Sequence, residues 1–205
     1  GRFAGFASVD PRNEDAPEEL ARAFTELKLD GLKLNLSHLQ MYPDDARLQP
    51  LYELCLAHNK PITFHCGFSW EPDSPSKYAR PILYEDVAVR YPELRFCLAH
   101  LGWPWVDELC MLLLKYPNVY TDTATVFMDS PKNWFEQIFL KNTAPGWLQN
   151  NLMDKVMFGS NLPRFRQVRT KYGLEQLHLR PDVLEKVLGG NAKVFLGMEV
   201  RDYAY

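Results

Sequence analysis

Short runs rich in apolar, β-branched and aromatic residues alternate along the whole sequence with amphipathic stretches. Most of these runs are apolar at nearly every position, and they occupy 3–9, 32–36, 62–65, 95–99, 119–123 and 156–159. Strands that are covered by helices on both faces have this character, whereas strands with one solvated face alternate apolar and polar residues. The pattern therefore predicts an α/β protein built around a parallel sheet of about six strands.

Helical stretches with recognisable start and stop signals separate the predicted strands. A first helix is predicted over 18–28, because Pro17 precedes it and Leu20, Phe24 and Leu27 lie about one turn apart. Further helices are expected at 47–57, 80–91, 105–116, 131–152 with a break at Pro145-Gly146, 181–189 and 191–196. Because no linker or sharp change of composition divides the chain, we expect one domain over residues 1–205.

Two architectures are built from repeated βα units of this length, the open doubly wound sheet and the (β/α)₈ barrel. The strand count and the 205 residues favour the open sheet, since a closed barrel has eight strands and typically roughly 250 residues. The positions of the reactive residues favour the barrel instead. In that case about two βα units are missing before residue 1, and the chain is an N-terminally incomplete barrel domain.

Charge and composition exclude several classes of protein. The net charge of -3 provides no basic face for a phosphate backbone, so we expect no nucleic-acid partner. No apolar run approaches the roughly 18 to 20 residues needed to cross a bilayer, so we expect no membrane partner. The four cysteines include no Cys-x-x-Cys pair, and we interpret them as reduced thiols of a cytoplasmic protein.

Reactive side chains follow the carboxyl ends of the predicted strands. His65 ends the third strand, His100 follows the fourth, and Asn161 follows the last. Ligand sites of both architectures form at these strand ends, so residues distant in sequence meet there. Two imidazoles on adjacent strands suit a first-row metal such as zinc, although a single His at a strand end is more often an ordinary hydrogen-bonded residue.

A second group of residues is suited to contact a substrate, and each has a simpler structural explanation. Lys33 lies within the second strand, where it either meets an anion or forms an ion pair. Trp70 and Trp103 either line a pocket or belong to the core. Asp122 either binds a ligand or caps the next turn, and Cys66 has no evident base partner.

Six motifs span nearly the whole chain, and they are Gly31–Leu34, Pro61–Gly67, Tyr91–Gly102, Pro117–Tyr120, Phe158–Pro163 and Gly189–Ala192. In this order they resemble the amidohydrolase superfamily, in the branch of the aminocarboxymuconate-semialdehyde decarboxylase-like enzymes. The resemblance implies a distorted (β/α)₈ barrel with one divalent metal, most commonly zinc, at its mouth. It also implies a homo-oligomer, such as a dimer, that acts on a small molecule.

The resemblance assigns roles to three residues. His65 matches a metal-binding His at the fifth strand of the full barrel, and His100 matches the sixth-strand His that polarises the substrate or helps to activate water. Asn161 stands where the family usually has an Asp, and an amide is no base near neutral pH. The family's His-x-His pair is absent, because the chain matches the family only from its third strand onward.

The leading hypothesis is a metal-dependent hydrolase or non-oxidative decarboxylase that acts on a small carboxylated or aromatic substrate. His100 and Asn161 are its candidate catalytic residues, His65 its metal ligand, and Lys33, Trp70, Trp103 and Arg164 its substrate contacts. The alternative is a degenerate, non-catalytic protein that binds a small ligand or a partner on the same fold. A nicotinamide-dependent oxidoreductase fits less well, because no Gly-x-Gly-x-x-Gly follows the first strand.

Overall fold

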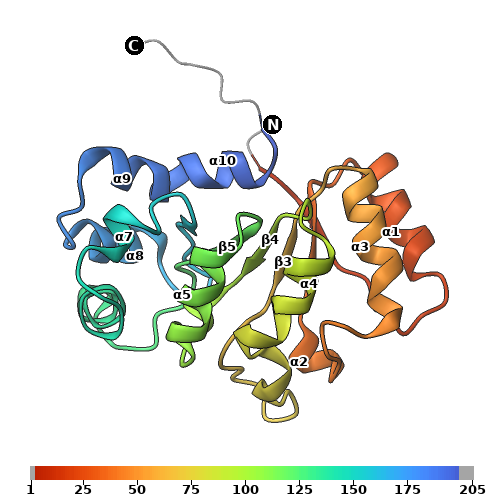
Figure 1. Ribbon diagram of the computed structural model, residues 1–205, viewed down its shortest axis with the longest axis horizontal. Coiled ribbons are helices and arrows are strands. Elements are labelled where there is room, and N and C mark those ends of the chain that lie inside the picture. The colour runs from red at the N-terminus through yellow and green to blue at the C-terminus, as the bar shows by residue number, and fades with distance from the viewer. Residues whose placement is uncertain (1–2, 199–205) are drawn as a thin grey trace.

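A computed structural model describes residues 3–198 and contains one six-stranded parallel sheet (Figure 1). The strands are β1 (Phe6–Ala7), β2 (Gly31–Leu34), β3 (Ile62–Phe64), β4 (Phe96–Leu98), β5 (Val119–Asp122) and β6 (Val156–Met157). Five of them lie within the predicted runs, β2 begins one residue before its run, and all six are shorter than predicted. The parallel sheet expected from the apolar pattern is therefore confirmed.

The order of the strands in the sheet decides between the two architectures. Each strand pairs with the next one in the sequence, from β1 to β6. A doubly wound sheet reverses its strand order at a switch point, whereas a barrel adds each strand beside the previous one. The inference from strand count, which favoured the open sheet, is thus wrong, and the sheet is a partial (β/α)₈ barrel.

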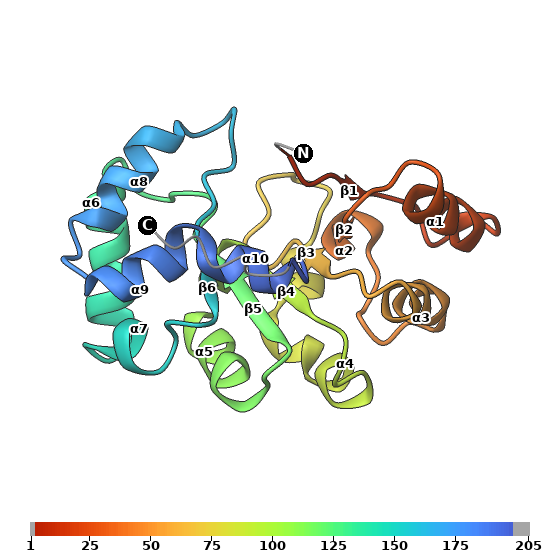
Figure 2. The same ribbon diagram turned by 90° about the horizontal axis from the view of Figure 1, so that it is seen from above.

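Four helices cover the outer face of the sheet, and all four lie close to the predicted positions (Figures 1 and 2). They are α1 (Ala16–Thr25), α3 (Gln49–Ala57), α4 (Glu85–Arg90) and α5 (Val106–Lys115). The remaining helices are α2 (Leu36–Leu39), α6 (Pro131–Glu136), α7 (Trp147–Asn150), α8 (Gln167–Glu175), α9 (Pro181–Glu185) and α10 (Asn191–Phe195), with π-helical turns at Gln137–Asn142 and Lys186–Gly190. No helix of residues 3–198 has both the length and the apolar character that a membrane span requires.

Helix α8 was not predicted, because its sequence lacks the stripe of apolar residues that marks an amphipathic helix. It carries Thr170 and Gly173 among its few buried residues, and neither residue type signals a helix. Gly173 lets α8 approach α6 closely, since a Cβ built there would lie 2.6 Å from Cβ of Pro131. Packing between two helices, rather than local propensity, therefore defines this element.

Alternation along the strands separates two layers of side chains. Leu32, Ile62, Phe96 and Val119 are neighbours in register and are fully buried in the main core. The next residues along the strands point to the opposite, inner face, and include Lys33, Thr63, Cys97 and Tyr120. The outer layer forms the core beneath the helices, and the inner layer leads to the candidate site.

Helix α10 covers the amino end of the inner layer (Figure 2). The Phe195 ring lies 5.3 Å from the Tyr120 ring, and Arg95 Nε donates a hydrogen bond of 2.8 Å to the Phe195 carbonyl. Asn191 Nδ2 donates to the carbonyls of Met153 and Val156 at 2.7 and 2.8 Å. These contacts attach α10 to the amino ends of β4, β5 and β6, and they leave the carboxyl end of the sheet for a ligand.

Candidate active site

The register of the strands brings the two predicted imidazoles together. His65 directly follows β3 and donates its backbone N–H to the carbonyl of Leu34 at 2.8 Å, so the pairing with β2 continues to the site. His100 lies two residues after β4, which pairs with β3. The centroids of the two rings are 4.9 Å apart. Two residues 35 positions apart in the sequence thus meet at one strand edge.

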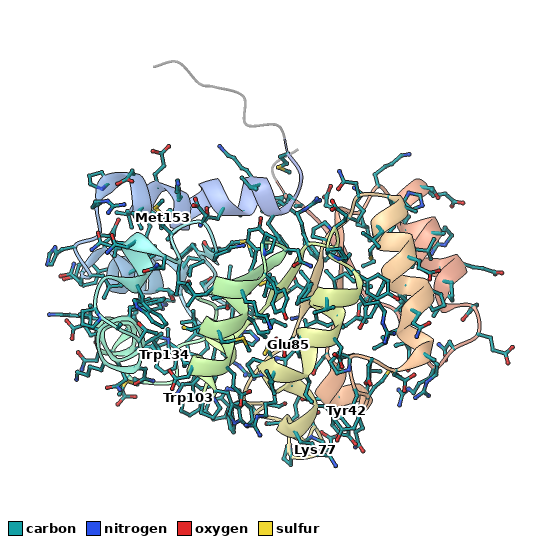
Figure 3. All side chains as sticks on the ribbon, in the orientation of Figure 1. Tyr42, Lys77, Glu85, Trp103, Trp134 and Met153 are labelled. Carbon is teal, nitrogen blue, oxygen red and sulfur yellow. The ribbon has the colours of Figure 1, made fainter. Side chains whose placement is uncertain are left out.

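A cavity of about 630 Å³ opens at this edge. It is lined by Lys33, Asn35, His65, Phe68, Ser69, Trp70, Glu71, His100, Thr125, Phe127, Asn161, Pro163 and Arg164. Six of the seven candidate catalytic, metal-binding and substrate-binding residues line it. The exception is Trp103. Its ring stacks on the lining residue Phe127 with centroids 4.6 Å apart, and it lies 6.0 Å from the ring of Trp134, so it packs behind the lining (Figure 3 labels both tryptophans).

His100 is held in a defined orientation by the segment that follows β5. Its Nδ1 lies 3.1 Å from the carbonyl oxygen of Ala124 and 3.2 Å from Thr125 Oγ1. A carbonyl only accepts, so we assign the hydrogen to Nδ1 and the free lone pair to Nε2. Burial lowers the pKa of His100, while the nearby Asp122 carboxylate opposes that shift. The ring is therefore neutral near pH 7, with Nε2 as its basic atom.

Asp122 caps the turn after β5, which decides between the two roles that the sequence left open. Its Oδ1 accepts the backbone N–H groups of His100 at 2.8 Å and Ala124 at 3.0 Å. The same oxygen lies 4.0 Å from His100 Nδ1. Asp122 thus positions the backbone on both sides of His100.

His65 presents a buried ring nitrogen that lacks a partner. Its Nε2 has no hydrogen bond within the described residues. Burial, followed by the charges of His100 and Lys33, lowers the pKa of His65 to about 3. Because an unpaired buried polar atom is costly, this nitrogen indicates a place where a ligand supplies the missing partner.

Lys33 lines the same cavity as the two imidazoles. Burial lowers the pKa of its ammonium group, whereas Asp122 opposes that shift. The ion pair that offered a simple explanation for Lys33 is not formed by any of residues 3–198. An anionic group in the cavity would meet this charge.

Asn161 belongs to a hydrogen-bond network rather than acting as a base. Its Nδ2 donates to Thr125 Oγ1 at 3.0 Å, and Thr125 in turn lies beside His100. Thr125, Phe127 and Asn35 also line the cavity and were not predicted as site residues. Asn35 directly follows β2 and Thr125 lies three residues after β5, and these positions at the strand ends were the signal that could have identified them.

The predicted zinc site is incomplete in the described part of the chain. Residues 3–198 contain no group of three His, Cys, Asp or Glu side chains that could hold a metal ion. His65 Nε2 offers one nitrogen, but a zinc site needs at least three protein ligands, and the Asn161 amide is a weak donor. These residues alone therefore do not fit a bound metal.

The comparisons with known proteins agree with the partial barrel. The family model described as amidohydrolase matches residues 1–198, so this chain belongs to that family. Protein fluG of Emericella nidulans is 35% identical over 69 residues, which are 34% of this chain and 8% of that protein. The chain thus spans only a small part of its curated relative.

Three solved structures share the fold over nearly the whole chain. An uncharacterised TIM-barrel protein from Bordetella bronchiseptica has a TM-score of 0.75 and 24% identity, and the match covers 95% of this chain and 66% of that one. A dihydroxybenzoic acid decarboxylase from Polaromonas, with bound manganese and 2-nitroresorcinol, has a TM-score of 0.68 and 19% identity. That match covers 96% of this chain and 69% of the decarboxylase chain. A 4-oxalomesaconate hydratase from Rhodopseudomonas palustris has a TM-score of 0.65 and 21% identity, and the match covers 95% of this chain and 66% of the hydratase chain.

Gly67 sits at a backbone crossing beside the histidines, and we expect Gly67→Ala to destabilise the protein. Its φ is +88°, and a Cβ built there would lie 2.3 Å from the Trp103 carbonyl oxygen. The free energy of unfolding should fall by at least about 2 kcal/mol, because both the strained φ and the clash must be accommodated. Urea denaturation measures this change.

The matched control is Gly189→Ala in the C-terminal helical segment. Nothing lies within 4 Å of a Cβ built at Gly189. Alanine there should be neutral or raise the free energy of unfolding by up to about 1 kcal/mol. Equal effects of the two substitutions would contradict the role given to Gly67.

Acid should destabilise the fold in part through His65. The unfolded chain takes up a proton as the pH falls through about 6.5, whereas folded His65 resists protonation until about pH 3. The contribution of His65 to the free energy of unfolding is therefore complete above pH 6.5, and it decreases as the pH falls towards 3. We expect the free energy of unfolding to fall by about 1 to 2 kcal/mol between pH 7 and pH 5 because of this residue.

Urea denaturation at both pH values, with His65→Gln beside the parent chain, measures this contribution. The substituted chain should lose less stability on acidification. The exposed His38, changed to Gln, is the control and should behave like the parent. Identical pH dependence of the parent and His65→Gln would rule out the expected contribution.

Proposed function

We propose that this chain carries the substrate pocket of an enzyme that removes the carboxylate from a small aromatic acid. The observation behind this proposal is the position of Lys33, a cation without an ion pair in the described chain, beside His65 and His100. A carboxylate would neutralise Lys33, and its oxygens would accept a hydrogen bond from His65 Nε2–H.

The walls of the cavity suit a flat apolar ring. Phe68, Trp70 and Phe127 line it, with Phe68 and Phe127 ring centroids 5.7 Å apart and Trp70 stacked on Phe127 at 5.8 Å. Aromatic side chains favour aromatic ligands through stacked or edge-to-face contacts, each worth about 0.5 to 1.5 kcal/mol beyond area burial. The aromatic wall and Lys33 therefore favour an aromatic carboxylate over an aliphatic or uncharged ligand.

His100 is the residue that we propose to move a proton. Loss of carbon dioxide leaves an electron pair on carbon, which must accept a proton. In this step Nε2 of His100 takes up a proton from water and delivers it to that carbon, because Nδ1 is occupied by Ala124 and Thr125. Asn161 holds Thr125 in this arrangement and has a positioning role.

Hydrolysis is the second candidate for the reaction, since both reactions were expected from the sequence. A hydrolase needs a base to deprotonate water, and Asp122 is engaged by two backbone N–H groups. The cavity also contains Glu71 as its only carboxylate among the described lining residues. His100 Nε2 and Glu71 are the bases that the cavity offers a hydrolase, so the preference for decarboxylation rests on the aromatic wall and Lys33.

Binding and turnover by the purified chain test the proposal. 2-Nitroresorcinol should quench the tryptophan fluorescence, since Trp70 lines the cavity. Dihydroxybenzoate, assayed with and without added Mn²⁺, should release carbon dioxide. Binding without turnover in either condition would overturn decarboxylation and favour the non-catalytic binding protein, while absence of both would overturn the pocket assignment.

A further inference from the structure

A second cavity of about 540 Å³ adjoins the first and is rich in arginine. Trp70, Phe127 and Arg164 line both cavities, so the two spaces meet at these side chains. Arg166 and Arg169 line only the second cavity. Three guanidinium groups thus gather on one side of an aromatic wall that the proposed substrate would contact.

These arginines lack the acidic partners that most of the other described arginines have. Five of the other seven bind a carboxylate, as Arg12 does with Asp10 and Arg80 with Glu108. By contrast, the side chains of Arg164 and Arg166 have no hydrogen bond or ion pair within residues 3–198, and Arg169 donates only to the backbone carbonyl of Asp129. Asp129 is the single acidic residue of the described lining.

We infer that this second cavity binds a second carboxylate of an elongated aromatic substrate. The inference rests on the proposed function, because it places the reacting carboxylate near Lys33 in the first cavity. Guanidinium groups bind carboxylates through paired hydrogen bonds, and unpaired arginines beside a cavity leave those donors available. The aromatic wall between the cavities accommodates the ring that joins the two carboxylates.

Equilibrium binding of matched diacids and monoacids tests the subsite without turnover. The two pairs are 3-(4-carboxyphenyl)propanoate with 4-propylbenzoate, and biphenyl-4,4'-dicarboxylate with biphenyl-4-carboxylate. At least one diacid should bind about tenfold more tightly than its monoacid, as expected for hydrogen bonds between charged groups. Calorimetry on the full chain provides the dissociation constants.

Arg166→Gln should remove this preference, whereas Arg166→Lys should restore part of it. Arg90→Gln is the control, because Arg90 is also exposed and has no partner among the described residues. It lines neither the first cavity nor the second, arginine-rich cavity. Thermal unfolding checks that each variant is folded. A preference below twofold for both diacids, or one that persists in Arg166→Gln, would overturn the inference.

The outcomes for the subsite and for the reaction are separate. A diacid preference that depends on Arg166, without release of carbon dioxide from any acid, would support the subsite and overturn the decarboxylase. Turnover of a monoacid that is unaffected by Arg166→Gln, with no diacid preference, would support the decarboxylase and overturn the subsite.

Discussion

His100→Asn is expected to lower kcat/KM for the carboxylate substrate by about 10² to 10⁴ while the protein stays folded. The substitution is designed to preserve structure, because Asn tolerates the positive φ of 64° at this position. Its Nδ2 can also replace the Nδ1 hydrogen bond to the Ala124 carbonyl. Only the basic Nε2 is removed, so the loss would report proton transfer rather than misfolding.

Steady-state release of carbon dioxide and thermal unfolding measure the two consequences separately. His38→Asn is the control, since His38 is exposed and lies outside the cavity. We expect it to retain the parent kcat/KM. Activity of His100→Asn within threefold of the parent would contradict the role proposed for His100, and a large loss of thermal stability would show that the design had failed to isolate Nε2.

Phe64→Ala is expected to lower the free energy of unfolding by about 3 to 5 kcal/mol. The Phe64 side chain is fully buried on β3, and its ring lies 4.9 Å from Tyr84, 5.9 Å from Phe96 and 6.1 Å from Tyr52. Alanine would leave a cavity surrounded by three rings that cannot all move inward. Because His65 is the next residue, the substitution should also disturb the site.

Chemical denaturation of the parent chain and the variant provides this free energy. Phe3→Ala is the matched control, because the same side chain is removed where it is 94% exposed. Phe3→Ala should change the free energy of unfolding by less than about 0.5 kcal/mol. A loss below about 1.5 kcal/mol for Phe64→Ala would contradict the packing described for the aromatic cluster around β3.

Strand positions, most helices and the candidate site residues were predictable because each depends on a short stretch of sequence. The apolar runs around Leu32, Ile62 and Phe96 mark strands covered on both faces, and the structure buries all three completely. The strand ends then identify His65 and His100, since parallel strands deliver their carboxyl ends to one edge. The distance between the rings confirms that they converge, while their chemical roles remain predictions.

Other features depended on contacts between distant segments, and only the tertiary structure decided them. The barrel arrangement follows from which strands pair, and strand count alone pointed to the other architecture. The backbone around His100 selects capping for Asp122, and stacking on Phe127 moves Trp103 behind the cavity wall. The arginine-rich cavity likewise forms only where the segments after β5 and β6 meet. Local sequence determines the backbone pattern and which side chains reach the sheet edge, whereas packing determines which of them face the same space.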